Sequence, residues 1–239
     1  MQNIYIITGG TMVHITPHFS ITAPAYGKVG VEIDDLLRTN LANKNDILYL
    51  VKTKMAGVNS DEVTEHLKSL NLKSTIETND ELKSFVEVIS KESSTQAIIM
   101  AAAICDFEPE KLSAYEDKTP VTITDFGKDK KRLHKAHSLE LKLKPSRKII
   151  DIIKKTNSTI FLVTFKTTAG ESEDVLVEKS FYNLKRSQSN MVFGNDIKNK
   201  INLIVTEEEE VLRAESRGEA LALFCRVFFR KISKNKEKI

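Results

Sequence analysis

A buried strand that ends in small residues and a carboxylate is the first place in this chain where chemistry is expected. Segment 96–103 is rich in Ile and Ala, which is typical of a parallel strand buried on both faces, and Asp106 follows it closely. Ligands of open α/β sheets bind outside the carboxyl ends of the strands, where Ala102 and Ala103 would let a base or sugar approach the backbone. Asp106 would then hydrogen-bond the ligand or hold a cation; the alternative interpretation is that it only caps a loop or helix.

A lysine-dense segment, Lys128-Asp129-Lys130-Lys131, lies further along the chain. Either its lysines neutralise the charge of a polyphosphate, or the segment is a solvated turn. Gly9 and Gly10, which follow the first expected strand, allow a tight turn with a close approach of the backbone to phosphate. The ring of Phe165, beside Lys166, either stacks on a base or packs in the core. These residue types together favour a nucleotide-dependent transfer.

Two later pairs of polar residues extend this set. Lys185-Arg186 ends an expected helix and offers positive charge for phosphate. Asn195-Asp196 follows an expected strand, where a simple turn is the default interpretation. Both pairs remain candidates on residue type alone.

Alternation of apolar strands with amphipathic helices predicts a parallel sheet with helices on both faces. No internal repeat or long linker interrupts the pattern, which predicts a single α/β domain over 1–239. The expected strands are 4–7, 47–51, 73–76, 96–103, 159–165, 191–193, 201–205 and 211–214. The expected helices are 31–41, 61–70, 80–90, 146–155, 171–186 and 219–232.

The middle of the chain has a different pattern. Segments 121–124 and 139–143 alternate with period two, so each should have one face in water. They flank the basic stretch 128–135. This pattern predicts an antiparallel hairpin or flap, inserted at about 116–144, that projects from the parallel sheet.

Composition narrows the class of protein. The chain has 239 residues, and its formal net charge of +3 is too small to indicate a nucleic-acid partner. Cys105 and Cys225 lie far apart in apolar segments, which predicts buried free thiols in a reducing compartment. The chain enters its first strand without a signal peptide, and no apolar stretch reaches membrane-spanning length. We therefore expect a soluble cytoplasmic protein without a membrane partner.

Several familiar chemistries are disfavoured by spacing. The first strand-to-helix turn lacks the Gly-x-Gly-x-x-Gly pattern of dinucleotide binding, and Gly27-Lys28 lacks the upstream glycine of a Walker loop. Tyr182 and Lys185 are one residue too close for the Tyr-x-x-x-Lys pair of short-chain oxidoreductases. His14 and His18 have ligand-like spacing, but Pro17 separates them and no cysteine or carboxylate joins them. Metal chemistry at these histidines is therefore disfavoured.

The chain resembles the phosphopantothenoylcysteine synthetase family over nearly its whole length, as a stand-alone synthetase without the flavin decarboxylase domain to which it is fused in many bacteria. Five short motifs in matching order carry the resemblance: Thr8-Gly9-Gly10-Thr11, Ala102 to Phe107, Lys128 to Lys131, Thr164-Phe165-Lys166 and Gly194-Asn195-Asp196. The resemblance implies a Rossmann-like domain that dimerises through an antiparallel flap.

The resemblance also implies a reaction. A nucleotide, CTP or ATP, would activate the carboxylate of 4′-phosphopantothenate with Mg, and cysteine would displace the nucleoside monophosphate to form an amide in coenzyme A biosynthesis. The catalytic residues would be Lys128, which neutralises phosphate charge, and Asp106, which binds the nucleotide or its metal. Residues of the nucleotide site would be Gly9, Gly10, Thr11, Ala102, Ala103, Asp106, Lys128, Phe165, Lys166 and Lys185.

The substrate segment departs from the family. The implied substrate-binding positions are Ala23, Tyr26, Gly27 and Asn195, but the family has asparagine where this chain has Ala23 and hydroxyl residues at Ala25 and Tyr26. Alanine has neither donor nor acceptor to orient an acyl-nucleotide. Two basic residues of the family's penultimate helix fall at Asn183 and Ser187, on either side of Lys185-Arg186. A divergent nucleotide-binding paralogue without ligase activity is therefore the alternative to a ligase.

Overall fold

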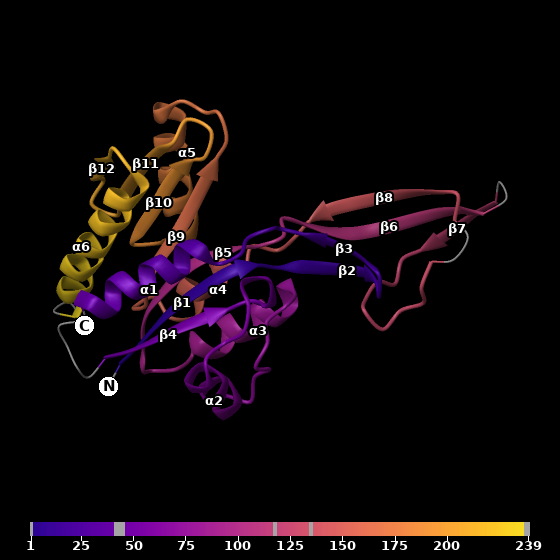
Figure 1. Cartoon of the computed structure of the whole chain (residues 1–239), viewed down its shortest axis with the longest axis horizontal. Coiled ribbons are helices and arrows are strands. Elements are labelled where there is room, and N and C mark those ends of the chain that lie inside the picture. The colour runs from indigo at the N-terminus through magenta and orange to yellow at the C-terminus, as the bar shows by residue number, and fades with distance from the viewer. Residues whose placement is uncertain (1, 41–45, 117–118, 134–135, 237–239) are drawn as a thin grey trace.

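The structure, a computed structural model, describes residues 2–40, 46–116, 119–133 and 136–236. A sheet of seven strands in the order β12-β11-β10-β9-β5-β1-β4 forms its body, with helices on both sides (Figure 1). Strands β4, β1, β5, β9 and β10 are parallel, whereas β11 and β12 are each antiparallel to their neighbours. These strands are β1 (Gln2–Gly10), β4 (Asp46–Lys52), β5 (Thr95–Ala103), β9 (Phe161–Thr168), β10 (Met191–Asp196), β11 (Ile201–Thr206) and β12 (Val211–Ala214). The predicted fold class is confirmed.

Six α-helices lie at the predicted places among the described residues, together with a short 3-10 helix, η1 (Lys54–Ala56). They are α1 (Lys28–Asn40), α2 (Asp61–Ser69), α3 (Asn79–Ile89), α4 (Ile150–Thr156), α5 (Glu173–Ser187) and α6 (Arg217–Lys236). Leu41, predicted to end α1, lies outside the described residues. The predicted helix at 146–155 begins later, at Ile150, and the amide of Ser146 donates to the carbonyl of Asp106 at 2.8 Å.

Alternate residues of β1 enter two different hydrophobic cores, one on each face of the sheet. Ile4 and Ile6 pack with residues of α1 and α6, while Tyr5 and Ile7 pack with residues of α2, α3 and α4. Successive side chains of a strand point to opposite faces, so helices must cover both sides of this strand. None of the helices in the described part of the chain is long and apolar enough to span a bilayer.

A second sheet extends away from the first, as Figure 1 shows, and carries the predicted segments 121–124 and 139–143. Its strands are β6 (Phe107–Glu116), β7 (Thr119–Ile123) and β8 (Ser138–Pro145). We call residues 107–145 the flap. Strands β7 and β8 do not pair with each other as the predicted hairpin requires, because β6 lies between them and pairs antiparallel with both. The basic residues 134 and 135 lie outside the described residues.

Sequence reasoning missed β6 and the hairpin of β2 (Met12–Thr16) and β3 (Phe19–Thr22). The pairing of β6 with β8 shifts register between Pro109 and Lys111, which breaks the period-two pattern that identifies strands. The predicted strand at 73–76 is wrong, since among the described residues this segment forms only an isolated bridge between Ile76 and Thr53.

Candidate active site at the carboxyl edge of the sheet

The central strand β5 brings the alanine-rich motif to the glycine pair. Gly9 pairs with Ala102 and Gly10 with Ala103 in the parallel register of β1 and β5. Asp106 follows β5 at this edge, and its side chain is exposed and pairs with Lys148 at 2.5 Å between Oδ1 and Nζ. The structure therefore places the predicted carboxylate where ligands of open α/β sheets bind.

The two glycines are required by packing of the chain on itself. Gly9 has a φ of +106°, and an added Cβ would lie 2.1 Å from Oγ1 of Thr53. A Cβ on Gly10 would lie 2.1 Å from the carbonyl oxygen of Ala23. Any larger residue would push these segments off the end of β1, so the glycines bring the predicted substrate segment against the strand.

Thr11 joins three segments at this edge. Its buried hydroxyl donates to Oδ1 of Asn79 at 2.6 Å and accepts from the amide of Cys105 at 2.9 Å. Nδ2 of Asn79 in turn donates to the carbonyl of Cys105 at 2.8 Å. The side chain predicted to bind nucleotide is thus engaged in fixing the loop that carries Asp106.

The predicted substrate segment lies beside these strand ends. The amide of Ala23 donates to the carbonyl of Thr11 at 2.9 Å, which fixes this segment next to the glycine pair. Gly27 has a φ of +79°, which favours glycine, and its carbonyl accepts from Oγ1 of Thr8. The side chain of Tyr26 is 76% exposed. Ala23, Tyr26 and Gly27 therefore lie at the same edge as Ala102 and Ala103.

Phe165, Lys166 and Asn195 lie on β9 and β10. The half-buried ring of Phe165 stacks on Phe193, with 5.4 Å between centroids, so it packs against the core. Lys166 is half-buried, and Asn195 is buried with its Oδ1 accepting from Oγ1 of Thr167 at 2.9 Å. The side chain predicted to bind substrate is thus already hydrogen-bonded within the protein.

Asn195 and Asp196 are the last two residues of β10 and do not form the turn of the default interpretation, which follows at 197–200. Burial by itself would raise the pKa of the Asp196 carboxyl, but amides of Asn199, Gly170 and Glu171 and the hydroxyl of Thr168 donate to it and hold its pKa well below the ordinary range. The ionised carboxylate therefore fixes the loop after β9 to the loop after β10.

The structure does not bring Lys185 to this edge. Lys185 is an exposed residue in the last turn of α5, and Asn190, just after that helix, bonds the carbonyl of Leu162 near the start of β9. Because α5 runs back along the sheet after β9, its last turn lies at the amino ends of the strands. Lys185 and the carboxyl-edge residues are therefore at opposite edges.

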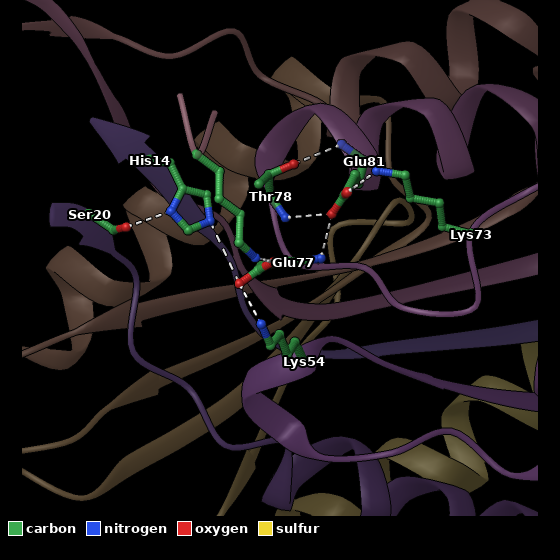
Figure 2. Close-up of polar contacts among 8 residues, drawn as sticks. His14, Ser20, Lys54, Lys73, Glu77, Thr78 and Glu81 are labelled. Carbon is green, nitrogen blue, oxygen red and sulfur yellow. Dashed lines mark hydrogen bonds and ion pairs between the residues drawn. The ribbon is translucent and has the colours of Figure 1, made fainter. Parts of the chain in front are cut away.

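Lys128 faces a cleft at the base of the flap. This cleft of about 530 Å³ is lined by residues of β2, the start of α3, the start of β6 and the flap loop, among them His14, Glu77, Glu108 and Lys128. Nζ of Lys128 donates to Oε2 of Glu77 at 2.9 Å, and Nζ of Lys54 donates to Oε1 at 2.8 Å. Figure 2 shows the side chains of Lys54 and His14 pointing toward the carboxylate of Glu77.

Glu77 is ionised in this cluster. Its side chain is 14% exposed, and burial alone would raise the pKa of its carboxyl. Hydrogen bonds and positive charge from Lys54 and Lys128 outweigh burial and lower the pKa to about 2. Nε2 of His14 lies 3.6 Å from the same carboxylate, and its Nδ1 bonds Oγ of Ser20 at 2.8 Å.

Sequence reasoning missed Glu77, Lys54 and Ser20, and treated His14 only as a disfavoured metal ligand. These residues come from separate segments with no shared motif, so the cluster exists only once the loops are in place. A local signal exists for Glu77 alone, because it precedes the capping box of Thr78 and Glu81 that begins α3.

Both cysteines are free and buried, as predicted. Burial raises the pKa of the Cys225 thiol to about 12, which excludes it as a thiolate nucleophile near neutral pH. Among the described residues, no group of three His, Cys, Asp or Glu side chains could hold a metal ion.

Comparisons with known proteins agree with the motifs. The family model of the DNA/pantothenate metabolism flavoprotein C-terminal domain matches residues 1–224. The coenzyme A biosynthesis bifunctional protein CoaBC of Thermococcus kodakarensis is 26% identical over 211 residues, which cover 88% of this chain and 44% of that protein. The chain thus spans less than half the length of this relative.

Solved structures share the fold. The DNA/pantothenate metabolism flavoprotein from Streptococcus pneumoniae superposes with a TM-score of 0.72 at 20% identity, covering 98% of this chain and 99% of that one. A histidine-to-alanine mutant of Cab2, in complex with phosphopantothenate-cysteine, superposes with a TM-score of 0.67 at 15% identity, covering 99% and 88%. The family match over residues 1–224 shows that the chain belongs to the DNA/pantothenate metabolism flavoprotein C-terminal domain family.

Proposed function

We propose that the chain is a ligase that joins 4′-phosphopantothenate to cysteine through an acyl-nucleotide. The observation that supports this most is the meeting of two motifs: Lys128 lines the same cleft as Glu108, just beyond Asp106. A carboxylate oxygen of phosphopantothenate would attack the α-phosphorus of CTP or ATP, and pyrophosphate would leave. The amine of cysteine would then attack the acyl carbon, form the amide and release the nucleoside monophosphate and a proton.

Lys128 is the candidate for charge neutralisation in the first step. Its side chain is 58% exposed at the cleft, so its ammonium group can meet a phosphate without leaving the protein surface. Negative charge develops on the phosphates as pyrophosphate leaves, and a fixed cation there stabilises the transition state. Phe165 and the backbone after Ala102 are the proposed base pocket.

Mg fits this site only together with the nucleotide. Proteins bind Mg through one or two carboxylates plus substrate phosphates, and Asp106 is the carboxylate at the strand end. Its side chain is 67% exposed, so it is accessible to a metal–phosphate complex, which would compete with Lys148 for the carboxylate. Asp106 would then orient the phosphates toward the substrate carboxylate.

A homodimer through the flap is part of the proposal. Leu139 and Val121 lie on either side of Ala114 in the flap sheet, so they share one face. Val121 is 47% exposed, Leu139 46% and Leu143 38%. A second copy of the chain would cover this apolar face.

The buried free thiols suit action in a reducing cytoplasm.

A nucleotide-binding paralogue without ligase activity is the second candidate. Ala23 favours it, because the chain fixes this residue beside the strand ends through its backbone while its side chain offers no hydrogen bond. Such a protein would bind nucleotide without completing the amide.

One assay separates these candidates. The protein is incubated with MgCTP or MgATP, 4′-phosphopantothenate and cysteine, and amide and pyrophosphate are measured, while a thermal-shift panel reports binding of each nucleotide. Amide formation that falls with Lys128→Gln, but not with Lys111→Gln on the exposed flap surface, supports the ligase. Stabilisation by nucleotide without amide supports the paralogue. If neither nucleotide stabilises the protein, both candidates are wrong.

A further inference from the structure

Glu77 is held in place by its own backbone before any ligand binds. Its carbonyl accepts from the amide of Met12 at 3.0 Å, and its amide donates to Oε2 of Glu81 at 2.8 Å. The first bond fixes Glu77 to the start of β2, and the second fixes it to the first turn of α3. The carboxylate therefore projects into the cleft from a backbone that is hydrogen-bonded to both β2 and α3.

Lys128 lies on the loop between β7 and β8, whose segment 124–133 is attached to the rest of the molecule near the same point. The amide of Gly127 donates to the carbonyl of Ile15 at 3.3 Å, and Lys130 pairs with Asp125 and Asp129 inside the loop. The bond from Lys128 to Glu77 connects this loop to the body of the protein. Loss of that bond should release the loop more than the core.

The sharing of one carboxylate between two lysines matters for ligand binding. Lys54 and Lys128 bond different oxygens of Glu77, so the carboxylate keeps a cation if Lys128 moves. An ammonium group has three donors, and the bond to Glu77 uses one of them. Lys128 can therefore contact a phosphate while it stays bonded to Glu77.

We propose that Glu77 is a positioning residue: it holds the ammonium group of Lys128 over the cleft, in the place where the polyphosphate of the nucleotide co-substrate binds. The phosphate ligand in this inference rests on the proposed function, whereas the contact between Glu77 and Lys128 does not. Glu77 acts through Lys128 and does not touch the reacting atoms. The contrary possibility is that Glu77 competes with phosphate for Lys128, which predicts the opposite effect on affinity.

Two measurements on the full chain test the proposal. Hydrogen exchange is followed across 124–133 without nucleotide in the wild type and in Glu77→Gln, which keeps the shape of the side chain and removes its charge. Binding of MgCTP and MgATP is then titrated in both proteins, in Lys128→Gln and in the double variant. Glu110→Gln is the matched control, because it also removes a flap ion pair, with Lys142 at 2.7 Å, away from Glu77.

We expect Glu77→Gln to speed exchange in 124–133 and to weaken nucleotide binding, each about two- to fivefold, as for an ion pair whose lysine is 58% exposed. Glu110→Gln should change neither, and Glu77→Gln should have no further effect on binding when Lys128 is already Gln. Unchanged exchange in Glu77→Gln overturns the proposal, as does tighter binding or an additive loss in the double variant. A wild type that binds neither nucleotide overturns the proposed function and with it the phosphate role, whereas bound nucleotide with unchanged exchange overturns the Glu77 proposal alone.

Discussion

The hydroxyl of Thr11 donates to Oδ1 of Asn79 at 2.6 Å, and this bond joins the end of β1 to the first residue of α3. The same hydroxyl accepts from the amide of Cys105, just before Asp106. A single buried oxygen thus sets the relative positions of three segments that surround the candidate site.

Thr11→Val should destabilise the protein. The replacement keeps the size of the side chain but leaves the amide of Cys105 and Oδ1 of Asn79 without this partner, which costs about 1–3 kcal/mol. The free energy of unfolding is measured by urea denaturation. Thr39→Val is the control, because its hydroxyl bonds the carbonyl of Asp35 on an exposed helix surface and its loss should cost under about 0.5 kcal/mol. Equal losses in both variants would contradict the structural role of Thr11.

Glu77 should make stability depend on pH in acid. Its pKa is lowered to about 2 in the folded protein from an ordinary value of 4.5, so its charge stabilises the fold fully above pH 4.5. That contribution is lost as the pH falls from 4.5 through 2. The difference in unfolding free energy between wild type and Glu77→Gln should therefore be constant near neutrality and shrink below pH 4.5. Urea denaturation at pH 7, 5 and 3 measures this difference in unfolding free energy. A difference that grows in acid would show that folding raises the pKa of Glu77 instead of lowering it.

Ala23→Asn should raise the rate of amide formation if the rest of the site is intact. A well-placed hydrogen-bond donor is worth up to about 10²–10³ in rate at sites of this kind, while nucleotide binding should change little. Product is measured by mass spectrometry at saturating substrates. Ala25→Asn, in the same segment, is the control and should not reproduce the gain. Rapid turnover by the wild type would instead show that another residue serves in place of the family's asparagine.

Leu139→Glu should weaken self-association through the flap. The side chain is 46% exposed on the apolar face of the flap sheet, and a buried carboxylate there would lack a partner in the dimer. Sedimentation velocity measures the shift from dimer to monomer. Val58→Glu provides the comparison, because Val58 is 87% exposed outside the flap and its replacement should leave the mass unchanged. A wild type that sediments as a monomer at every concentration would rule out this interface.

Local patterns in the chain were enough to predict the body of the fold. The apolar run at 96–103 is central and parallel, and it places Asp106 beside Gly9 and Gly10, because neighbouring parallel strands end at the same edge. The helices that cover the sheet carry their apolar residues at helical spacing, so they too were visible in short windows of sequence.

Elements without a clean period were not predictable in this way. Strand β6 contains Pro109 and a register shift, and its partners β7 and β8 looked like a hairpin because the strand between them was unrecognised. Thr11 was expected to bind nucleotide from its motif, yet its hydroxyl is used within the protein. The resemblance implies that Lys185 belongs to the nucleotide site, whereas the direction of α5 places it at the other edge of the sheet.

The sequence alone determined the α/β class, the central strand and the place of the candidate carboxylate, because each depends on periodicity within a few residues or on the common direction of parallel strands. Only the tertiary structure decided that Lys54 and Lys128 both bond the carboxylate of Glu77 at the cleft. Lys54 lies in η1, Glu77 lies just before the N-cap residue of α3, and Lys128 lies in the flap loop. No spacing in the chain relates these three residues. Ion pairs between distant segments depend on where loops cross in space, and that is determined by packing of the whole molecule.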